Sequence, residues 1–162
     1  PVGAGIAAGL KLKGNETSRV YVLMGDGEQS EGSIWEAVMN TKHQKLGNLI
    51  GIIDENKLGF DGTLEEISGL ADFAGKYKAF GWNVIEVDGH DITKLMGVFD
   101  NLPDASSDVP TVVICKTIKG KGVDFMENSV KWHAGQLSEK NRDEAINQLE
   151  QSFVEKWGGL DE

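Results

Sequence analysis

Two short apolar runs in the first third of the chain each stop abruptly at three residues of turn-forming or polar character. Residues 20–24 run into Gly-Asp-Gly at 25–27, and residues 49–53 run into Asp-Glu-Asn at 54–56. Continuous apolar runs of this length are typical of strands that are buried on both faces of a parallel sheet. The pattern therefore predicts two such strands, with a polar turn at the carboxyl end of each.

The segment between these runs has the spacing of an amphipathic helix. Ser33, with Glu36 three residues later, has the form of a capping box at the start of this helix. Strand, helix and strand make a βαβ unit, in which both strands run parallel and both polar ends open at the same edge of the sheet. The apolar positions that indicate the helix are Ile34, Trp35, Val38, Met39 and Leu46.

The remainder of the chain continues this alternation of helices and strands. It predicts an α/β fold with a doubly wound, mostly parallel sheet and helices on both faces. The length of 162 residues suits a single domain over 1–162, and the start at Pro1, already inside an Ala/Gly-rich segment, indicates truncation at the N-terminus. The further elements that we expect are helices over 1–13, 70–80 and 93–102, strands over 83–87 and 111–115, and a last helix capped by Ser138.

Periodicity also predicts which side chains of these helices face the core. Gly81 has the position of a C-cap for the helix that begins near Leu70. Gly3-Ala4-Gly5 resembles a dinucleotide fingerprint, but its spacing is wrong and no strand precedes it, so we expect it to allow close packing on the sheet. The inward positions are expected to be Ile6, Leu10 and Leu12 in the first helix and Ile146, Leu149, Phe153 and Trp157 in the last.

Asp26 and Asn56 are the first candidates for chemistry, because a βαβ unit brings them to one edge of the sheet. Carboxylate and amide oxygens, beside glycine amides and a helix N-terminus, suit a magnesium ion and a phosphate group. Gly-Asp-Gly is also good turn chemistry, so Asp26 by itself leaves a plain turn open. The two residues together favour the metal site.

Calcium is the alternative metal for the second polar turn. Asp54, Asn56, Gly59 and Glu65 fall at positions 1, 3, 6 and 12 of an EF-hand loop. Leu58 occupies position 5, where an oxygen ligand is expected, and a buried strand precedes the loop where an EF-hand has a helix. These departures favour magnesium.

One histidine and two glutamates complete the candidates. His133 ends the long glycine-bearing segment 116–135, again near the carboxyl edge, although a structural role stays open. His90 is either a ligand or a turn residue that is bonded to its neighbours. Glu31 and Glu36 open the first predicted helix, where acidic residues also favour the helix dipole.

Composition excludes several classes of partner. A formal net charge of −10 argues against nucleic acid or an anionic membrane surface as the main partner. No apolar run approaches the ~20 residues that a membrane-spanning helix needs. Cys115 is the one cysteine and cannot form an internal disulfide, which suits the reducing cytoplasm.

Several short motifs extend over nearly the whole chain. They are Gly25-Asp26-Gly27-Glu28, Glu31-Gly32, Trp35-Glu36-Ala37, Asn48-Leu49, Asp54-Glu55-Asn56, Gly62-Thr63-Leu64-Glu65-Glu66-Ile67, Asp88-Gly89-His90-Asp91, Lys116-Thr117, Lys119-Gly120-Lys121-Gly122-Val123, Met126-Glu127 and Trp132-His133. This set resembles transketolases, and it is most similar to the N-terminal, thiamine diphosphate-binding subunit of transketolases that are split over two polypeptides. The Gly-Asp-Gly…Asn pair is common to thiamine diphosphate enzymes, whereas the Trp-Glu-Ala, Asp-Gly-His-Asp and Lys-Gly-Lys-Gly motifs narrow the resemblance to transketolase-like members.

The resemblance implies a thiamine diphosphate-binding fold and a role for individual residues. Asp26, the side-chain oxygen of Asn56 and the backbone carbonyl of Leu58 would bind Mg²⁺. The Gly27 amide and His133 would contact the cofactor diphosphate. A dianionic diphosphate needs a cation and amide donors, so these residue types are in accord with the resemblance.

Four other positions receive roles from the resemblance alone. Val2 and Phe60 match positions that pack against the cofactor rings. Glu31 would lie at the subunit interface, near an acidic network that couples cofactor sites, together with Glu36. His133 and Glu31 are thus the residues that the resemblance ties to catalysis.

The chain also departs from the family pattern. Ala134 stands where the family has glycine after Trp-His, and Leu137 stands near the position of an expected proline. The upstream segment with its further histidines is absent from this sequence. The pyrimidine-binding domain, whose glutamate activates the cofactor, is absent too. A partner, the C-terminal transketolase subunit that carries this domain, is therefore expected, and the chain is expected to be inactive without it.

The function implied is a transketolase-type transfer of a two-carbon ketol unit between sugar phosphates, as in the pentose phosphate pathway. The first alternative is 1-deoxyxylulose-5-phosphate synthase or another thiamine diphosphate-dependent ketol transferase. The alternative from another class is a non-catalytic binding or regulatory protein on the same fold. Intact Asp26, Asn56 and His133 argue against that last alternative.

Overall fold

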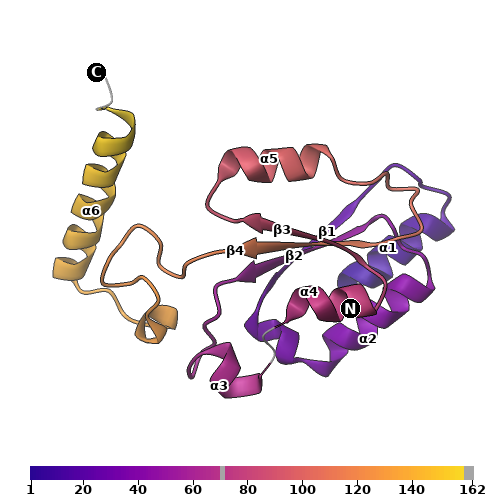
Figure 1. Cartoon of the computed structure of the whole chain (residues 1–162), viewed down its shortest axis with the longest axis horizontal. Coiled ribbons are helices and arrows are strands. Elements are labelled where there is room, and N and C mark those ends of the chain that lie inside the picture. Colours follow the sequence, from indigo (N-terminus) through magenta and orange to yellow (C-terminus); the bar gives the residue numbers. More distant parts are fainter. Residues whose placement is uncertain (70–71, 159–162) are drawn as a thin grey trace.

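A computed structural model describes residues 1–69 and 72–158 of the chain, and its elements alternate between helix and strand (Figure 1). The predicted boundaries agree with the observed ones to within a few residues. The start near Leu70 that we expected for the helix over 70–80 lies outside the described residues. In chain order the elements are α1 (Val2–Leu12), β1 (Val20–Gly25), the 3₁₀ turn η1 (Gly27–Ser30), α2 (Gly32–His43), β2 (Leu49–Glu55), α3 (Leu64–Ser68), α4 (Phe73–Ala79), β3 (Asn83–Asp88), α5 (Ile92–Asp100), β4 (Thr111–Lys116), the 3₁₀ turn η2 (Val130–His133) and α6 (Glu139–Trp157).

The four strands form one parallel sheet in the order β1-β2-β4-β3. Gly25 at the end of β1 pairs with Asp54 of β2, which in turn pairs with Cys115 of β4. All four strands therefore end at one edge. The chain passes from β2 to the far strand β3 and returns to β4, so the strand order reverses between β2 and β4. In doubly wound sheets, ligands bind beyond the carboxyl ends of the strands at such a reversal.

Helices cover both faces of the sheet, as the sequence predicts. Figure 1 shows α5 on one side and α1, α2 and α4 on the other. The core under α1, α2 and α4 includes Ala7, Val38 and Tyr77, and the smaller core under α5 includes Val87 and Val113. None of the helices in the described ranges is long and apolar enough to cross a membrane.

The strand β1 is less buried than its apolar sequence predicts. Tyr21 and Leu23 are 50% and 72% exposed, whereas Met24 is buried. The reason is the position of α5, which packs over β2, β3 and β4. An edge contact between the rings of Phe99 and Tyr21 joins it to β1. The prediction that β1 is buried on both faces was therefore wrong.

The inward side of α1 also differs from the prediction. Ile6 and Leu12 are exposed, and the buried residue is Ala7. Gly3 packs so closely on β1 that an added Cβ would collide with Val22. Small residues thus bring this helix onto the sheet, as expected for the glycine-rich start, and its larger side chains point elsewhere.

At the start of α2 the predicted capping box does not form. The helix begins at Gly32 with Glu31 as its extended N-cap, so that Ser33 lies within the first turn and makes no capping bond. A true capping box is found at α3, where Thr63 and Glu66 bond to each other's backbone N–H groups.

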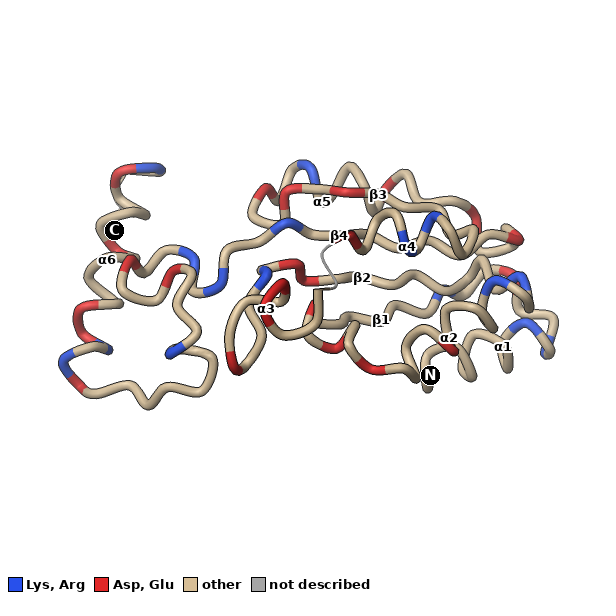
Figure 2. The backbone as a smooth tube through the Cα atoms, turned by 60° about the horizontal axis from the view of Figure 1, so that its bottom comes forward, with Lys and Arg blue, Asp and Glu red and all other residues tan. Residues whose placement is uncertain are grey.

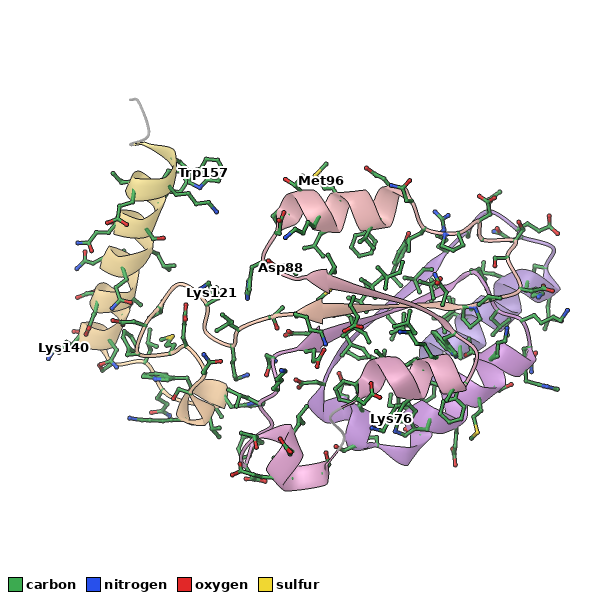
Figure 3. The ribbon with its side chains drawn as sticks, viewed as in Figure 1. Lys76, Asp88, Met96, Lys121, Lys140 and Trp157 are labelled. Atoms are coloured by element: carbon green, nitrogen blue, oxygen red, sulfur yellow. The ribbon has the colours of Figure 1, made fainter. Side chains whose placement is uncertain are left out.

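The last helix, α6, stands apart from the sheet (Figure 1). Ala145 is its buried residue, and Gln148 anchors it by two hydrogen bonds to Asp124, from the Asp124 backbone N–H at 2.9 Å and to Oδ1 at 2.5 Å. Trp157 is 68% exposed near the far end of the helix (Figure 3). The prediction of an inward apolar row was therefore wrong, because the helix rests on the loop before it and not on the core. The other exposed members of that row are Ile146, Leu149 and Phe153.

Candidate functional site

The turn after β1 and the turn after β2 are bonded to each other. The backbone N–H of Asp26 donates to the Asp54 carbonyl at 3.2 Å, which continues the ladder beyond the strands. In the other direction, Asp26 Oδ2 accepts the backbone N–H of Lys57 at 2.5 Å. The βαβ geometry thus brings Asp26 and the turn that contains Asn56 together, as the sequence predicts.

The turn after β2 has a defined backbone shape. Asn56 Oδ1 accepts the backbone N–H of Leu58 at 3.0 Å, and its Nδ2 lies 3.5 Å from Asp54 Oδ2. Lys57 between them has φ +66°, in the left-handed region. This conformation is uncommon for a residue with a side chain. The turn therefore holds its shape through bonds that the chain supplies itself.

Asp26 is a buried carboxyl group, only 2% exposed. Burial raises its pKa, and the charge of Asp54 adds to this effect, whereas the N–H groups of Lys57, Gly27 and Asn56 act in the opposite direction. Among the described residues no lysine, arginine or histidine forms an ion pair with Asp26. Burial disfavours the ionised form of Asp26, and a cation bound at this carboxylate would stabilise that form.

The oxygen donors around Asp26 fit magnesium better than other metals. In the described part of the chain, no three His, Cys, Asp or Glu side chains gather at a metal-binding distance. The ligands expected from the sequence are one carboxylate, one amide and a backbone carbonyl. These are hard oxygen ligands, and Mg²⁺ commonly takes few of them and fills its shell with water and phosphate. An EF-hand does not form, because the strand β2 precedes the loop and Leu58 is buried.

A cleft of about 710 Å³ opens next to this turn, at the carboxyl ends of β2 and β4. Asn56, Lys57 and Leu58 line it from one strand end, and Lys116 and Thr117 line it from the other. Acidic positions gather around these strand ends and α3, with basic positions in the segment after β4 (Figure 2). The cleft lies where the strand order reverses, as expected for a ligand site in this architecture.

Three side-chain contacts between neighbouring strand ends were not predicted from the sequence. The Thr117 hydroxyl bonds to the Asp54 carboxylate, and the Lys116 ammonium bonds to the buried Glu55 and, at 3.1 Å, to Glu86. Burial alone would lower the pKa of Lys116, but the bonds to the two glutamates outweigh it and the pKa is raised. The signal for Asp54 was present, because residues two apart in an extended segment share a side and Asp54 precedes Asn56 by two.

Phe60 and His133 come together from distant parts of the chain. Their rings meet edge to face with centroids 5.4 Å apart. Phe60 belongs to the same turn region as Asn56, so this contact connects the end of η2 to the carboxyl edge. Both side chains are exposed and free to meet a ligand.

Of the predicted site residues, Asn56 and Leu58 line the cleft. Val2 is exposed at the start of α1, and Glu31 is the exposed N-cap of α2. The predicted site residues that are not among the cleft's lining residues are Val2, Asp26, Gly27, Glu31, Phe60 and His133. His90 takes the turn role that we left open, since its Nε2 accepts the backbone N–H of Ile118 at 2.8 Å. It thereby fastens the start of the segment that leads to His133.

Glu127 holds the same segment, and the stability of this segment should therefore depend on pH. The Glu127 carboxylate accepts the Gly122 N–H at 3.0 Å and pairs with Lys121 at 3.2 Å, and these contacts lower its pKa below 4.5. The stabilisation is present above pH 4.5 and is lost as the pH falls through the lowered pKa of the folded chain. We expect the NMR shift of the Gly122 amide to titrate at that pH.

Glu127→Gln is the control for this titration. The amide oxygen still accepts a hydrogen bond but does not ionise, so the acid transition at Gly122 should vanish. A Gly122 signal that titrates equally in both proteins would show that another group controls the segment.

The chain is similar in sequence to members of one protein family. Residues 7–155 match the family described as "Transketolase, thiamine diphosphate binding domain". An apulose-4-phosphate transketolase subunit of Phocaeicola vulgatus is 40% identical over 148 residues, which cover 91% of this chain and 52% of that protein. The 6-deoxy-6-sulfo-D-fructose transketolase subunit SqwG of a Clostridium species is 37% identical over 131 residues, which cover 81% of this chain and 47% of that protein. The chain thus spans about half the length of these two relatives.

Solved structures agree with these relatives. The crystal structure of transketolase from Campylobacter jejuni superposes with a TM-score of 0.80 at 28% identity, and the match covers 91% of this chain and 24% of that one. Transketolase from Pichia stipitis, in a complex with sedoheptulose 7-phosphate, gives a TM-score of 0.78 at 28% identity, over 98% of this chain and 25% of that one.

Proposed function

This chain belongs to the transketolase family, within its thiamine diphosphate-binding domain, and we propose that it supplies the diphosphate- and Mg²⁺-binding half of a thiamine diphosphate site. The enzyme it serves transfers a two-carbon ketol unit between sugar phosphates. The observation that carries this proposal is the buried Asp26 carboxylate, which is bonded to the turn that contains Asn56 and has no cationic partner among the described residues.

The proposed roles follow from the chemistry of each group. The Asp26 carboxylate, the second lone pair of Asn56 Oδ1 and the Leu58 carbonyl hold Mg²⁺. The Gly27 N–H and the imidazole of His133 donate to the diphosphate oxygens. When it is bound, thiamine diphosphate supplies the electron sink for breaking and forming the bond next to the sugar carbonyl.

Apolar contacts complete the proposed site. Phe60 packs against the cofactor rings and excludes water, and its edge contact with His133 orients the imidazole. We also assign Val2 to this apolar wall, at the start of α1, and Glu31 to the interface between cofactor-binding halves. The exposure of Val2 and Glu31 is in accord with contacts to a partner.

We further propose that residues 1–162 act as one domain and that a second, C-terminal subunit provides the pyrimidine-binding domain. Two relatives are named as subunits of transketolases, and this chain matches about half the length of each.

The single cysteine supports a location in the cytoplasm, which we also propose. Cys115 is buried, and burial together with the nearby charge of Asp54 raises its pKa, so the thiol stays protonated. An unreactive, unpaired thiol suits a reducing cytoplasm.

The partner requirement is testable with purified components. We expect the chain alone to transfer no ketol group, because the group that activates the cofactor lies on the partner. Mixing with the partner subunit should restore transfer, together with Mg²⁺-dependent binding of thiamine diphosphate by calorimetry. Transfer by a pure sample of this chain alone would contradict the proposal.

The same mixture separates the alternatives. Release of 1-deoxyxylulose 5-phosphate from pyruvate and glyceraldehyde 3-phosphate would indicate the synthase, whereas exchange between ketose and aldose phosphates would indicate a transketolase. Tight cofactor binding without turnover of any donor would indicate the non-catalytic alternative.

A further inference from the structure

Gln29 is a polar side chain in the centre of the domain. It belongs to η1, two residues after Gly27, and its side chain is fully buried. Nothing in the proposed chemistry uses it. Burying an amide is unfavourable unless its donor and acceptor groups find partners, so its contacts show what it holds in place.

The contacts of Gln29 reach each side of the turn that contains Asp26. Its Nε2 lies 3.5 Å from the Gly25 carbonyl and 3.8 Å from Met24 Sδ, at the end of β1. Its backbone carbonyl accepts the indole N–H of Trp35 in α2 at 2.8 Å. Its backbone N–H donates to the Asp26 carbonyl at 3.1 Å.

The remaining bond of Gln29 connects this turn to a helix far along the chain. Oε1 accepts the hydroxyl of Tyr77 in α4 at 2.9 Å. Tyr77 is fully buried, and its ring centroid lies 5.4 Å from that of Trp35 and 5.3 Å from that of Trp82. Burial raises the pKa of the Tyr77 hydroxyl, so it remains a neutral donor. A buried tyrosine within an aromatic cluster therefore holds the Gln29 amide.

We infer that Gln29, held by Tyr77, is a positioning residue that fixes Asp26 and the Gly27 amide for the cation and the diphosphate. This inference rests on the proposed function, because it concerns the same site. The physical reason is that η1 is a short 3₁₀ turn that does not hold its own geometry well, whereas Gln29 ties it to β1, α2 and α4 at once.

The simplest alternative is that Gln29 and Tyr77 only stabilise the core. The positioning role and this structural role predict different results for a double substitution. Removing one partner leaves the other polar atom buried without a bond, which is costly, but replacing both with apolar groups of similar size is nearly neutral. In Gln29→Leu/Tyr77→Phe the stability should therefore return, while the connection between the turn and α4 remains absent.

The experiment uses the full chain, with Mn²⁺ and inorganic pyrophosphate as the probe and titration calorimetry as the readout. Gln29→Leu, Tyr77→Phe and the double variant are compared with Trp82→Phe as the matched control. Trp82 lies in the same cluster, and its indole N–H bonds to the Val38 carbonyl in α2 and not to η1. Its substitution should lower Tm and leave the affinity unchanged.

We expect each single variant and the double variant to bind the probe about tenfold more weakly, the range found for residues that orient metal ligands. Tm should fall in the single variants and recover in the double variant. Affinity that recovers together with Tm in the double variant would overturn the positioning role. If the wild-type chain binds no Mn²⁺-pyrophosphate even when the partner subunit is present, the proposed function fails, and this inference fails with it.

Hydrogen exchange provides a readout without any ligand. The amide of Gly27 should exchange faster in the double variant than in the wild type, even though their Tm values agree. Equal exchange rates at Gly27 would again leave only a structural role for the pair.

Discussion

Asp26→Asn is expected to abolish Mg²⁺-dependent cofactor binding and, at the same time, to stabilise the chain without ligand. The loss of affinity should be about 100-fold or more, since even residues behind metal ligands cost 10- to 100-fold. The amide oxygen of the new side chain can still accept the Lys57 N–H, but it carries no charge to bury. Stability at neutral pH should rise by about 1 kcal/mol, as for other substitutions that exchange function for stability.

The pH dependence of this difference has a definite sign. The pKa of Asp26 is higher in the folded chain than in the unfolded chain, so the ionised group is a cost at neutral pH. The advantage of Asp26→Asn should therefore be complete above the raised pKa and disappear as the pH falls through it. Urea unfolding at several pH values measures the difference, and calorimetry measures the cofactor affinity.

Asp26→Ala is the matched variant for this experiment. It removes the charge and also the acceptor for Lys57, so it should lose the cofactor without the gain in stability. An Asp26→Asn protein that binds cofactor and Mg²⁺ like the wild type would refute the metal assignment.

Gly47→Ala is expected to be among the most destabilising single substitutions in the chain. Gly47 lies just before β2, and a Cβ at this position would collide with the backbone carbonyl of Ser107 in the loop before β4. Backbone cannot rotate away as a side chain can, so one of the two central strands must shift. We expect a loss of about 3 kcal/mol in the free energy of unfolding.

Gly9→Ala in α1 serves as the control for Gly47. Apart from the neighbouring residues and backbone of α1 itself, no atom lies within 4 Å of a Cβ built at Gly9, and alanine favours the helix interior over glycine. This variant should be more stable than the wild type by about 0.5–1 kcal/mol. Urea unfolding that gave the two alanine variants equal stability would contradict the close contact between Gly47 and Ser107.

The sequence predicted those parts of the structure that depend on local pattern and on general rules of chain topology. The apolar runs that end at Asp26 and Asn56 defined parallel neighbouring strands, and the geometry of a βαβ unit then required the two turns to meet. That convergence needed no knowledge of any side-chain contact. It is the part of the candidate site that the fold alone determines.

What the sequence could not predict depends on contacts between distant parts of the chain. The burial of Tyr21 and Leu23 depends on where α5 lies, and the sequence pattern of β1 carries no information about the position of that helix. Likewise, the partner of Gln29 is 48 positions away, and neither residue stands out in its own segment. Helical spacing predicted an inward apolar row for α6, but this helix does not pack on the core and the row is exposed.

The outer strand β1 also affects how the chain behaves on its own. In the described sheet it has a neighbour only at β2, and Leu23 adds an exposed apolar side chain to that open edge. Natural proteins usually guard such edges with charges, prolines or bulges, and residues 20–24 contain no charge and no proline. An unguarded edge is a template for intermolecular strand pairing, the first step toward amyloid-like aggregation. We therefore expect the lone chain to associate through β1 despite its net charge of −10.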